Sequence, residues 1–285
     1  MNITKDCVEC IVGQIDKATK LLKLDEKLAN EINSEVEKRA SGFDFEKSPP
    51  FVAKDVYEYL AFKTNLKDPL ETLKEESIKK ATTYLPLIEE KISSSEDKLF
   101  TAIKAAVAGN VIDFATTKEF SLDEEINSIF QTDFSINDYK IFKEKLEKSD
   151  SLIILADNAG ENVFDKVLVK TIVSLYPNIQ ISYATRGKAI INDITTKEAL
   201  QSGIDKYCKV ISSGVDTPGL DKTRASKEFM ELFNKTPLVL SKGMGNFECL
   251  ESYNDEKIFF LFKVKCNVVA KTINRNLGEI ILKRG

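Results

Sequence analysis

The pattern of apolar residues changes near residue 150, and this change constrains the fold more than any other feature of the chain. From Met1 to about Lys148 apolar residues recur at helical spacing, and prolines, glycines and a serine run separate the helices. After Ser151 short apolar runs alternate with helical stretches. We place strands near 151–156, 179–185, 208–212, 237–241 and 257–264, and helices near 162–176, 196–202, 221–234 and 245–251.

This alternation of strands and helices is typical of a parallel sheet covered by helices on both faces. We therefore predict an α/β protein with two domains. Residues 1–148 form an all-helical N-terminal domain, and residues 149–285 form a C-terminal three-layer, Rossmann-like α/β/α domain with a mostly parallel sheet. Sheets of this kind bind their ligands at the carboxyl ends of the strands, so we look for a site there.

The composition removes several classes of function. The 285 residues include no histidine, which excludes Ser-His and Cys-His nucleophile pairs and histidine zinc sites. The formal net charge is −4 and no dense block of Lys and Arg occurs, so we expect neither nucleic acid nor a membrane as partner. With no apolar run of membrane length and no signal-peptide pattern, we expect a cytoplasmic protein. The oligomeric state cannot be predicted from the sequence.

The first predicted strand ends in two oxygen donors. Its apolar residues, Leu152 to Ala156, are followed at once by Asp157 and Asn158, and Glu161 comes just before the next helix. A carboxylate and a carboxamide are ligands that suit Mg²⁺ or Mn²⁺. The alternative is an Asp-Asn turn, with Glu161 placed in the first turn of the helix where it favours the helix dipole.

Polar and small residues also follow the later strands. Because the carboxyl ends of parallel strands meet at one edge, these loops should lie beside Asp157 and Asn158. Carboxylates that bind a divalent cation would then lie next to ammonium groups that bind a phosphate, and this combination is typical of sites for phosphoryl transfer. Each loop alone is a weak signal. The residues concerned are Asp193 after the second strand, Ser213 and Gly214 after the third, Lys242 and Asn246 after the fourth, and Lys265 after the last.

The helical part contributes two further candidates. Asn110 and Asp113 lie three residues apart on one face of a helix predicted from Leu99 to Thr116, and they either reach the site or serve as polar contacts between helices. Cys7 and Cys10 form one Cys-x-x-Cys pair, which is short of the four ligands that a structural zinc site needs. We favour reduced, packed thiols over a redox or metal role.

Several of these segments together resemble the damage-control phosphatases, a family long known as the domain of unknown function 89. The motifs are DNAGE after its apolar strand, INDIT, SKGMGNFE and KVKC, and they occur in the family's order. The archaeal-type branch is the most similar, because it also has the Cys7–Cys10 pair and the Ala-Gly-Asn-x-Ile-Asp run that starts at Ala108. The resemblance extends from Cys7 to about Ala270.

The resemblance implies hydrolysis of phosphate monoesters of small metabolites, such as sugar phosphates, nucleotides or damaged phospho-metabolites, with one divalent cation (Mn²⁺, Mg²⁺, Co²⁺ or Ni²⁺). By motif match the cation is held by Asp157, Asn158 and Asp193, and Lys265 lies near the substrate phosphate. Glu161 is shifted by one position from the eukaryotic branch. That branch also has an arginine-threonine pair where this chain has Lys263-Val264, so its sugar-phosphate specificity does not transfer.

Several alternatives stay open. The nucleophile is either water activated by the cation or one of the carboxylates. A binding protein for phosphorylated metabolites could use the same residues without turnover. A dinucleotide enzyme or methyltransferase is less well supported, because the first strand has no Gly-x-Gly-x-x-Gly turn. A carboxyl-group methyltransferase ranks lowest, since no adenosine-binding signature is visible.

Overall fold

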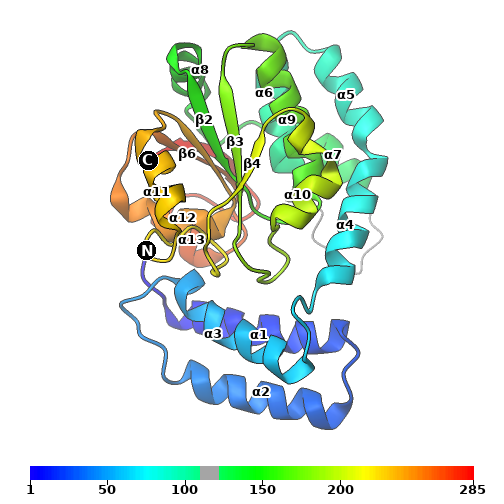
Figure 1. Cartoon of the computed structure of the whole chain (residues 1–285), viewed down its shortest axis with the longest axis vertical. Helices are drawn as coiled ribbons and strands as arrows, with labels where there is room; N and C mark the ends of the chain where they lie inside the picture. Colours follow the sequence, from blue (N-terminus) through cyan, green and yellow to red (C-terminus); the bar gives the residue numbers. More distant parts are fainter. Residues whose placement is uncertain (110–121) are drawn as a thin grey trace.

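A seven-stranded sheet forms the centre of the computed structural model, which describes residues 1–109 and 122–285 (Figure 1). The strand order is β1-β7-β6-β5-β2-β3-β4, and neighbouring strands are parallel except for the β6–β7 pair. The α/β class and the mostly parallel sheet are therefore confirmed. The strands are β1 (Ile136–Asn137), β2 (Ser151–Leu155), β3 (Gln180–Thr185), β4 (Lys209–Ser212), β5 (Val239–Lys242), β6 (Ile258–Lys263) and β7 (Ile280–Arg284).

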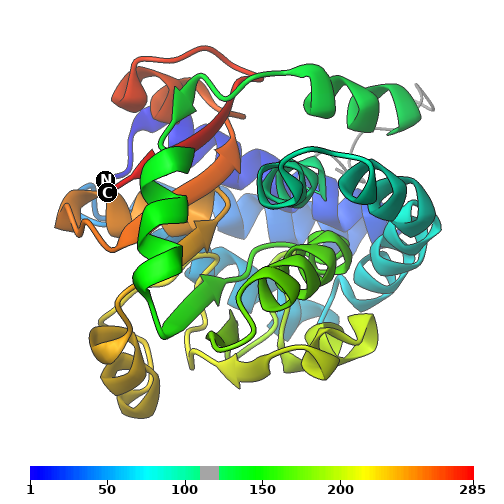
Figure 2. The same cartoon turned by 90° about the horizontal axis from the view of Figure 1, so that it is seen from above.

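Helices pack on both faces of the sheet because successive strand residues point to opposite sides. On one face Ile154 and Leu240 contact α6, α8 and α9, and on the other Leu155 and Phe260 contact α11, α12 and α13 (Figure 2). The helices are α1 (Lys5–Leu21), α2 (Glu26–Ala40), α3 (Pro49–Thr64), α4 (Glu71–Thr83), α5 (Leu85–Ser93), α6 (Lys98–Ala108), α7 (Leu122–Gln131), α8 (Tyr139–Lys148), α9 (Glu161–Leu175), α10 (Thr196–Ser202), α11 (Lys227–Lys235), α12 (Met244–Leu250) and α13 (Asn267–Ile273).

The first three helices form a separate lobe that lies across the carboxyl ends of the strands (Figure 1). The lobe has its own apolar core, which includes Ile15, Ile32 and Val56. Ile190, from the loop after β3, is buried in the same core. The lobe therefore covers the edge of the sheet at which the predicted site residues should lie.

All five predicted strands are present, and three elements were missed. β1 has two residues and β7 ends in charged residues, so neither shows a clear apolar pattern. The stretch before residue 149 is thus not wholly helical, because β1 pairs with β7. The third missed element is α13. The helix predicted from 221 begins only at Lys227, after Ser226 caps its first turn by accepting a hydrogen bond from Phe229 N.

The hydrophobic core crosses the predicted domain boundary. Residues of α5, α6 and α8 share one apolar cluster with β2, β5 and α9, and α6 and α9 are in extensive contact. The change of pattern at 150 thus coincides with the first long strand, while the helices from α4 onwards form part of a layer on the sheet. The division into a helical domain of residues 1–148 and an α/β domain of residues 149–285 stays a prediction.

The order of the strands places a topological switch point between β2 and β5. After β2 the chain passes through α9 on one face, and after β5 it passes through α12 on the other face. In open α/β sheets the crevice at such a point is where ligands bind. Asp157 follows β2 and Lys242 ends β5, so the candidate residues lie at this crevice.

Candidate active site

The loop after β3 runs back along the loop after β2 and brings two predicted ligands together. Ile194 N donates to Asp157 O at 3.0 Å and Ala159 N donates to Asn192 O at 2.9 Å, so Asn158 and Asp193 form an isolated antiparallel bridge. These backbone bonds place Asp157, Asn158 and Asp193 in the wall of one cavity. The structure therefore brings Asp193 next to the adjacent residues Asp157 and Asn158, although they are far apart in the sequence. Their role as metal ligands stays a prediction.

Arg186, at the end of β3, holds the two aspartates. Its Nε donates to Asp193 Oδ2 at 2.6 Å, and its Nη2 lies 3.7 Å from Asp157 Oδ1. The side chain is only 2% exposed, and Nη2 has no hydrogen-bond partner among the described residues. Arg186 was not among the predicted site residues, although its place directly after a strand was the available signal.

A buried ion-pair network extends from the site into the core. Asn158 Nδ2 donates to Asp157 Oδ2 at 2.9 Å and to Glu161 Oε1 at 3.0 Å. Lys242 Nζ donates to Glu161 Oε2 at 2.9 Å and to Asp165 Oδ1 at 2.7 Å. Burial alone would lower the pKa of Lys242, but the two carboxylates outweigh it and raise that pKa. Lys242 is therefore a buried ammonium that joins Glu161 and Asp165.

The site carries more negative than positive charge. The carboxyl groups of Asp157, Glu161, Asp165 and Asp193 face the cationic groups of Arg186 and Lys242, so the site has an excess of two negative charges when all four carboxyls are ionised. Burial raises the pKa of Asp157 well above its ordinary value, and Glu161 and Asp193 raise it further. Burial also raises the pKa of Asp193, although Arg186 opposes the rise.

These charges fit a divalent cation. Buried carboxylates that lack a counter-charge are costly, and a cation with two charges would balance the excess. Since the amide nitrogen of Asn158 is used by Asp157 and Glu161, its Oδ1 is the atom available to a ligand. No group of three or more His, Cys, Asp or Glu side chains in the described ranges has a metal-binding arrangement, so the protein ligands would be two carboxylates and one amide.

Gly243 makes room for the Asp157 carboxylate. The residue has φ +80°, and a Cβ at this position would lie 2.0 Å from Asp157 Oδ2. Gly243→Ala should therefore displace the carboxylate and reduce kcat/KM by about a hundredfold, because small displacements of reacting groups are costly. The measurement is phosphate release from a monoester with added Mn²⁺. Gly42→Ala, where the nearest atom is 3.5 Å from the added Cβ, should keep wild-type activity. Equal activities of the two variants would contradict this role for Gly243.

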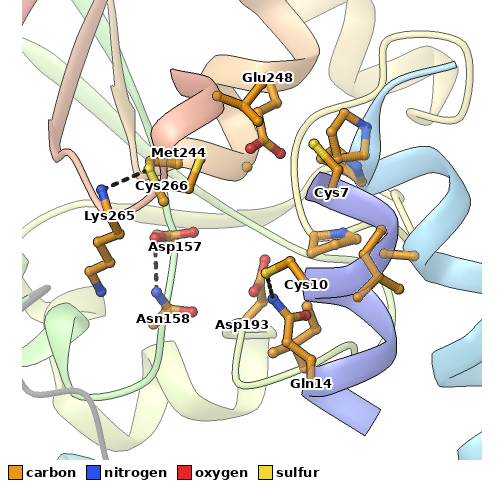
Figure 3. Close-up of a pocket in the computed structure, with 18 of the residues that line it drawn as sticks. Cys7, Cys10, Gln14, Asp157, Asn158, Asp193, Met244, Glu248, Lys265 and Cys266 are labelled. Atoms are coloured by element: carbon orange, nitrogen blue, oxygen red, sulfur yellow. Dashed lines mark hydrogen bonds between the residues drawn. The ribbon is translucent and has the colours of Figure 1, made fainter. Parts of the chain in front are cut away.

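The cavity at the switch point has a volume of about 430 Å³ and lies between the sheet edge and the helical lobe. Figure 3 shows Asp157, Asn158 and Asp193 on one side and Cys7, Cys10 and Gln14 of α1 on the other. Lys265 is exposed and is the one cationic side chain in this wall among the residues described. A phosphate held between Lys265 and a cation on the aspartates would lie inside this space.

Four predicted substrate contacts do not reach this cavity. Lys242 is fully buried. Asn246 Nδ2 donates to the backbone oxygens of Ala156 and Lys242, and its Oδ1 accepts a hydrogen bond from Leu220 N. Ser213 donates to Thr185 O, and Gly214 packs against Gly187, where a Cβ would lie 2.5 Å from the Gly214 carbonyl carbon. These residues fix the loops that carry the site. Glu161 lines a second cavity next to Asn158 and Lys265. Asn110 and Asp113 lie outside the described residues.

The cysteines are free thiols in the part of the chain that the structure describes. Cys7 is buried, while Cys10 is exposed and lines the cavity together with Cys7 and Cys266. Partial removal of its thiol from water by the cavity wall raises the pKa of Cys10, which favours the neutral thiol. The described residues also contain no helix with the length and apolar character needed to cross a membrane.

These features define an α/β protein with an acidic ligand cavity at the switch point of its sheet. Sequence comparison identifies the family: the damage-control phosphatase ARMT1-like domain matches residues 3–281, and the chain belongs to that family.

Two archaeal relatives match over nearly their full length. A damage-control phosphatase of Pyrococcus horikoshii is 30% identical over 100% of this chain and 98% of its own, and an uncharacterized protein of Methanocaldococcus jannaschii is 32% identical over 100% and 96%. The crystal structure of a domain of unknown function 89 family protein from Pyrococcus horikoshii superposes with a TM-score of 0.91 at 28% identity, covering 100% of this chain and 99% of that one. The family resemblance seen in the sequence motifs is thus confirmed.

Proposed function

We propose that the protein is a divalent-metal-dependent phosphatase that hydrolyses phosphate monoesters of small metabolites. The observation that carries the proposal is the pair of buried aspartates beside Asn158, joined by Arg186, in a cavity that also presents Lys265. The damage-control phosphatase names of the relatives from Pyrococcus horikoshii and Archaeoglobus fulgidus support the reaction class.

Asp157, Asn158 and Asp193 would hold the cation, which when bound supplies positive charge against the phosphoryl oxygens. Lys265 then contacts the phosphate from beside Asp157 and Asn158 (Figure 3), and no carboxylate of the described residues pairs with its ammonium. Arg186 keeps the two aspartates in place through its short bond to Asp193. The helical lobe covers the cavity and limits the access of bulk water to the ester.

A metal-by-substrate screen tests the proposal. Protein stripped with a chelator should release no phosphate, and Mn²⁺, Co²⁺, Ni²⁺ or Mg²⁺ should restore phosphate release from some members of a panel of monoesters. Chelator-stripped protein assayed without any added cation is the control for each cation. If no ester is cleaved with any cation while phosphate analogues still bind, the protein is a binding protein for phosphorylated metabolites. Radiolabel retained on rapidly quenched protein would identify a carboxylate nucleophile, and its absence would favour water.

A further inference from the structure

Glu248, on α12, is an acidic side chain of the cavity wall that the proposed reaction does not use. It lines the active-site cavity, and Figure 3 shows its carboxylate pointing into the cavity between Cys7 and Cys266. Among the described residues its carboxylate has neither a hydrogen bond nor an ion pair, because the Met1 ammonium bonds only to the Glu248 backbone oxygen. A carboxylate in this position is free to bind part of a substrate.

The rest of the wall shows which substrates would gain from Glu248. Apolar residues such as Ile11, Pro49 and Val268 form much of the surface away from the aspartates. Lys265, which we assign to the phosphate, is the one cationic side chain in the wall within the described ranges. A second anionic group on the substrate would therefore meet Glu248 without any counter-charge, and a cationic group would be attracted.

We infer that Glu248 is a specificity-determining residue that selects phosphate monoesters with an amine-bearing leaving group over those with a carboxylate or second phosphate. The inference rests on the proposed function, since the ester must lie with its phosphate at the aspartates and its leaving group toward α12. A short aminoalkyl chain then passes along the apolar wall and places its ammonium at Glu248.

Equilibrium binding separates this inference from turnover. We would titrate the Mn²⁺-loaded protein calorimetrically with aminopropylphosphonate, propylphosphonate and carboxyethylphosphonate. The three ligands share an uncleavable phosphonate and differ in the end of the chain, which is a cation, a neutral methyl group or an anion. The amine should bind about tenfold tighter than the neutral ligand, a size typical of one partly buried ion pair, and the carboxylate should bind more weakly than both. Glu248→Gln should reduce the first ratio to about one and leave propylphosphonate affinity unchanged.

The matched control is Glu9→Gln, because Glu9 is exposed on α1 and does not line the cavity. This variant should keep the wild-type ratio. Retention of the ratio in Glu248→Gln, equal weakening of all three ligands, or binding of none of them would overturn the inference. Intact discrimination without cleavage of any phosphate ester would instead contradict the proposed function and leave the role of Glu248 standing.

The pH gives a second readout that a structural role would not produce. Burial raises the pKa of Glu248 to about 7, although the Met1 ammonium lowers it. The ratio between amine and neutral ligand should therefore increase as the pH rises through 7, because the ionised carboxylate is the form that attracts the amine. Burial raises the pKa of the neighbouring thiols of Cys10, Cys249 and Cys266, so these stay neutral in this range. The other titratable side chains that line the cavity are Asp6, Cys7, Asp157, Asp193 and Lys265.

Discussion

Asp157→Asn should reduce phosphate release by at least about a thousandfold at saturating Mn²⁺, because the substitution removes one of two charged metal ligands from a buried site. The amide has the same shape, so the bridge between Asn158 and Asp193 should persist. Steady-state kinetics with a cleavable monoester measures the effect. Asp150→Asn is the matched control, since Asp150 is exposed at the opposite end of β2 and should be replaceable without loss.

The same substitution should stabilise the protein when no metal is present. Burial, Glu161 and Asp193 raise the pKa of Asp157 in the folded state, so the folded protein binds more protons than the unfolded chain between the ordinary carboxyl pKa and the raised one. The contribution of Asp157 to the stability of the metal-free protein is therefore fully present at low pH and is lost as the pH rises through this window. Asn cannot ionise, so the variant should lose the part of the pH dependence that comes from Asp157, and added Mn²⁺ should restore the stability of the wild type only.

Thermal unfolding across pH with and without Mn²⁺ measures this behaviour. Wild-type activity in Asp157→Asn would show that the metal ligands are assigned incorrectly. If metal-free Asp157→Asn is less stable than the metal-free wild type at neutral pH, the negative charge of Asp157 is already balanced by other groups of the protein. That result would contradict the excess negative charge of the site.

Lys242→Met should destabilise the protein by about 3–5 kcal/mol, because it removes the counter-charge of two buried carboxylates. Lys242 is fully buried and pairs with Glu161 and Asp165, and Tyr183 Oη donates to the other oxygen of Asp165 at 2.7 Å. Urea unfolding measures the free-energy change. Lys235→Met, at the exposed end of α11 just before β5, should have little effect.

A second substitution distinguishes this structural role from phosphate binding. Lys242→Met combined with Asp165→Asn should recover part of the lost stability, because one of the two unpaired carboxylates is then neutral. If Lys242 instead bound the substrate phosphate, Lys242→Met would raise KM and leave the unfolding midpoint nearly unchanged. That result would contradict the buried network.

Much of the candidate site could be predicted because it lies at strand ends. Asp157, Asn158, Asp193 and Lys265 each follow an apolar run, and a parallel sheet brings such positions to one edge whatever the details of packing. Strands β2 to β6 were predicted because each is a run of mainly apolar residues. β1 and β7 were missed because two residues and a charged strand end give no periodic signal.

The direction of each polar side chain was decided by tertiary packing. Lys242 and Lys265 both follow strands and look alike in sequence, yet one is enclosed by Glu161 and Asp165 while the other lies open in the cavity. Arg186 was missed because its function depends on two carboxylates that come from different loops.

By itself, the sequence determined the class of the fold, the edge of the sheet at which we place the candidate site, and the family to which the chain belongs. These follow from apolar periodicity and short motifs, which are local in the sequence and do not depend on the fold. Only the tertiary structure decided which charges neutralise one another and which face the cavity, because ion pairing depends on distances between residues that are far apart in the chain.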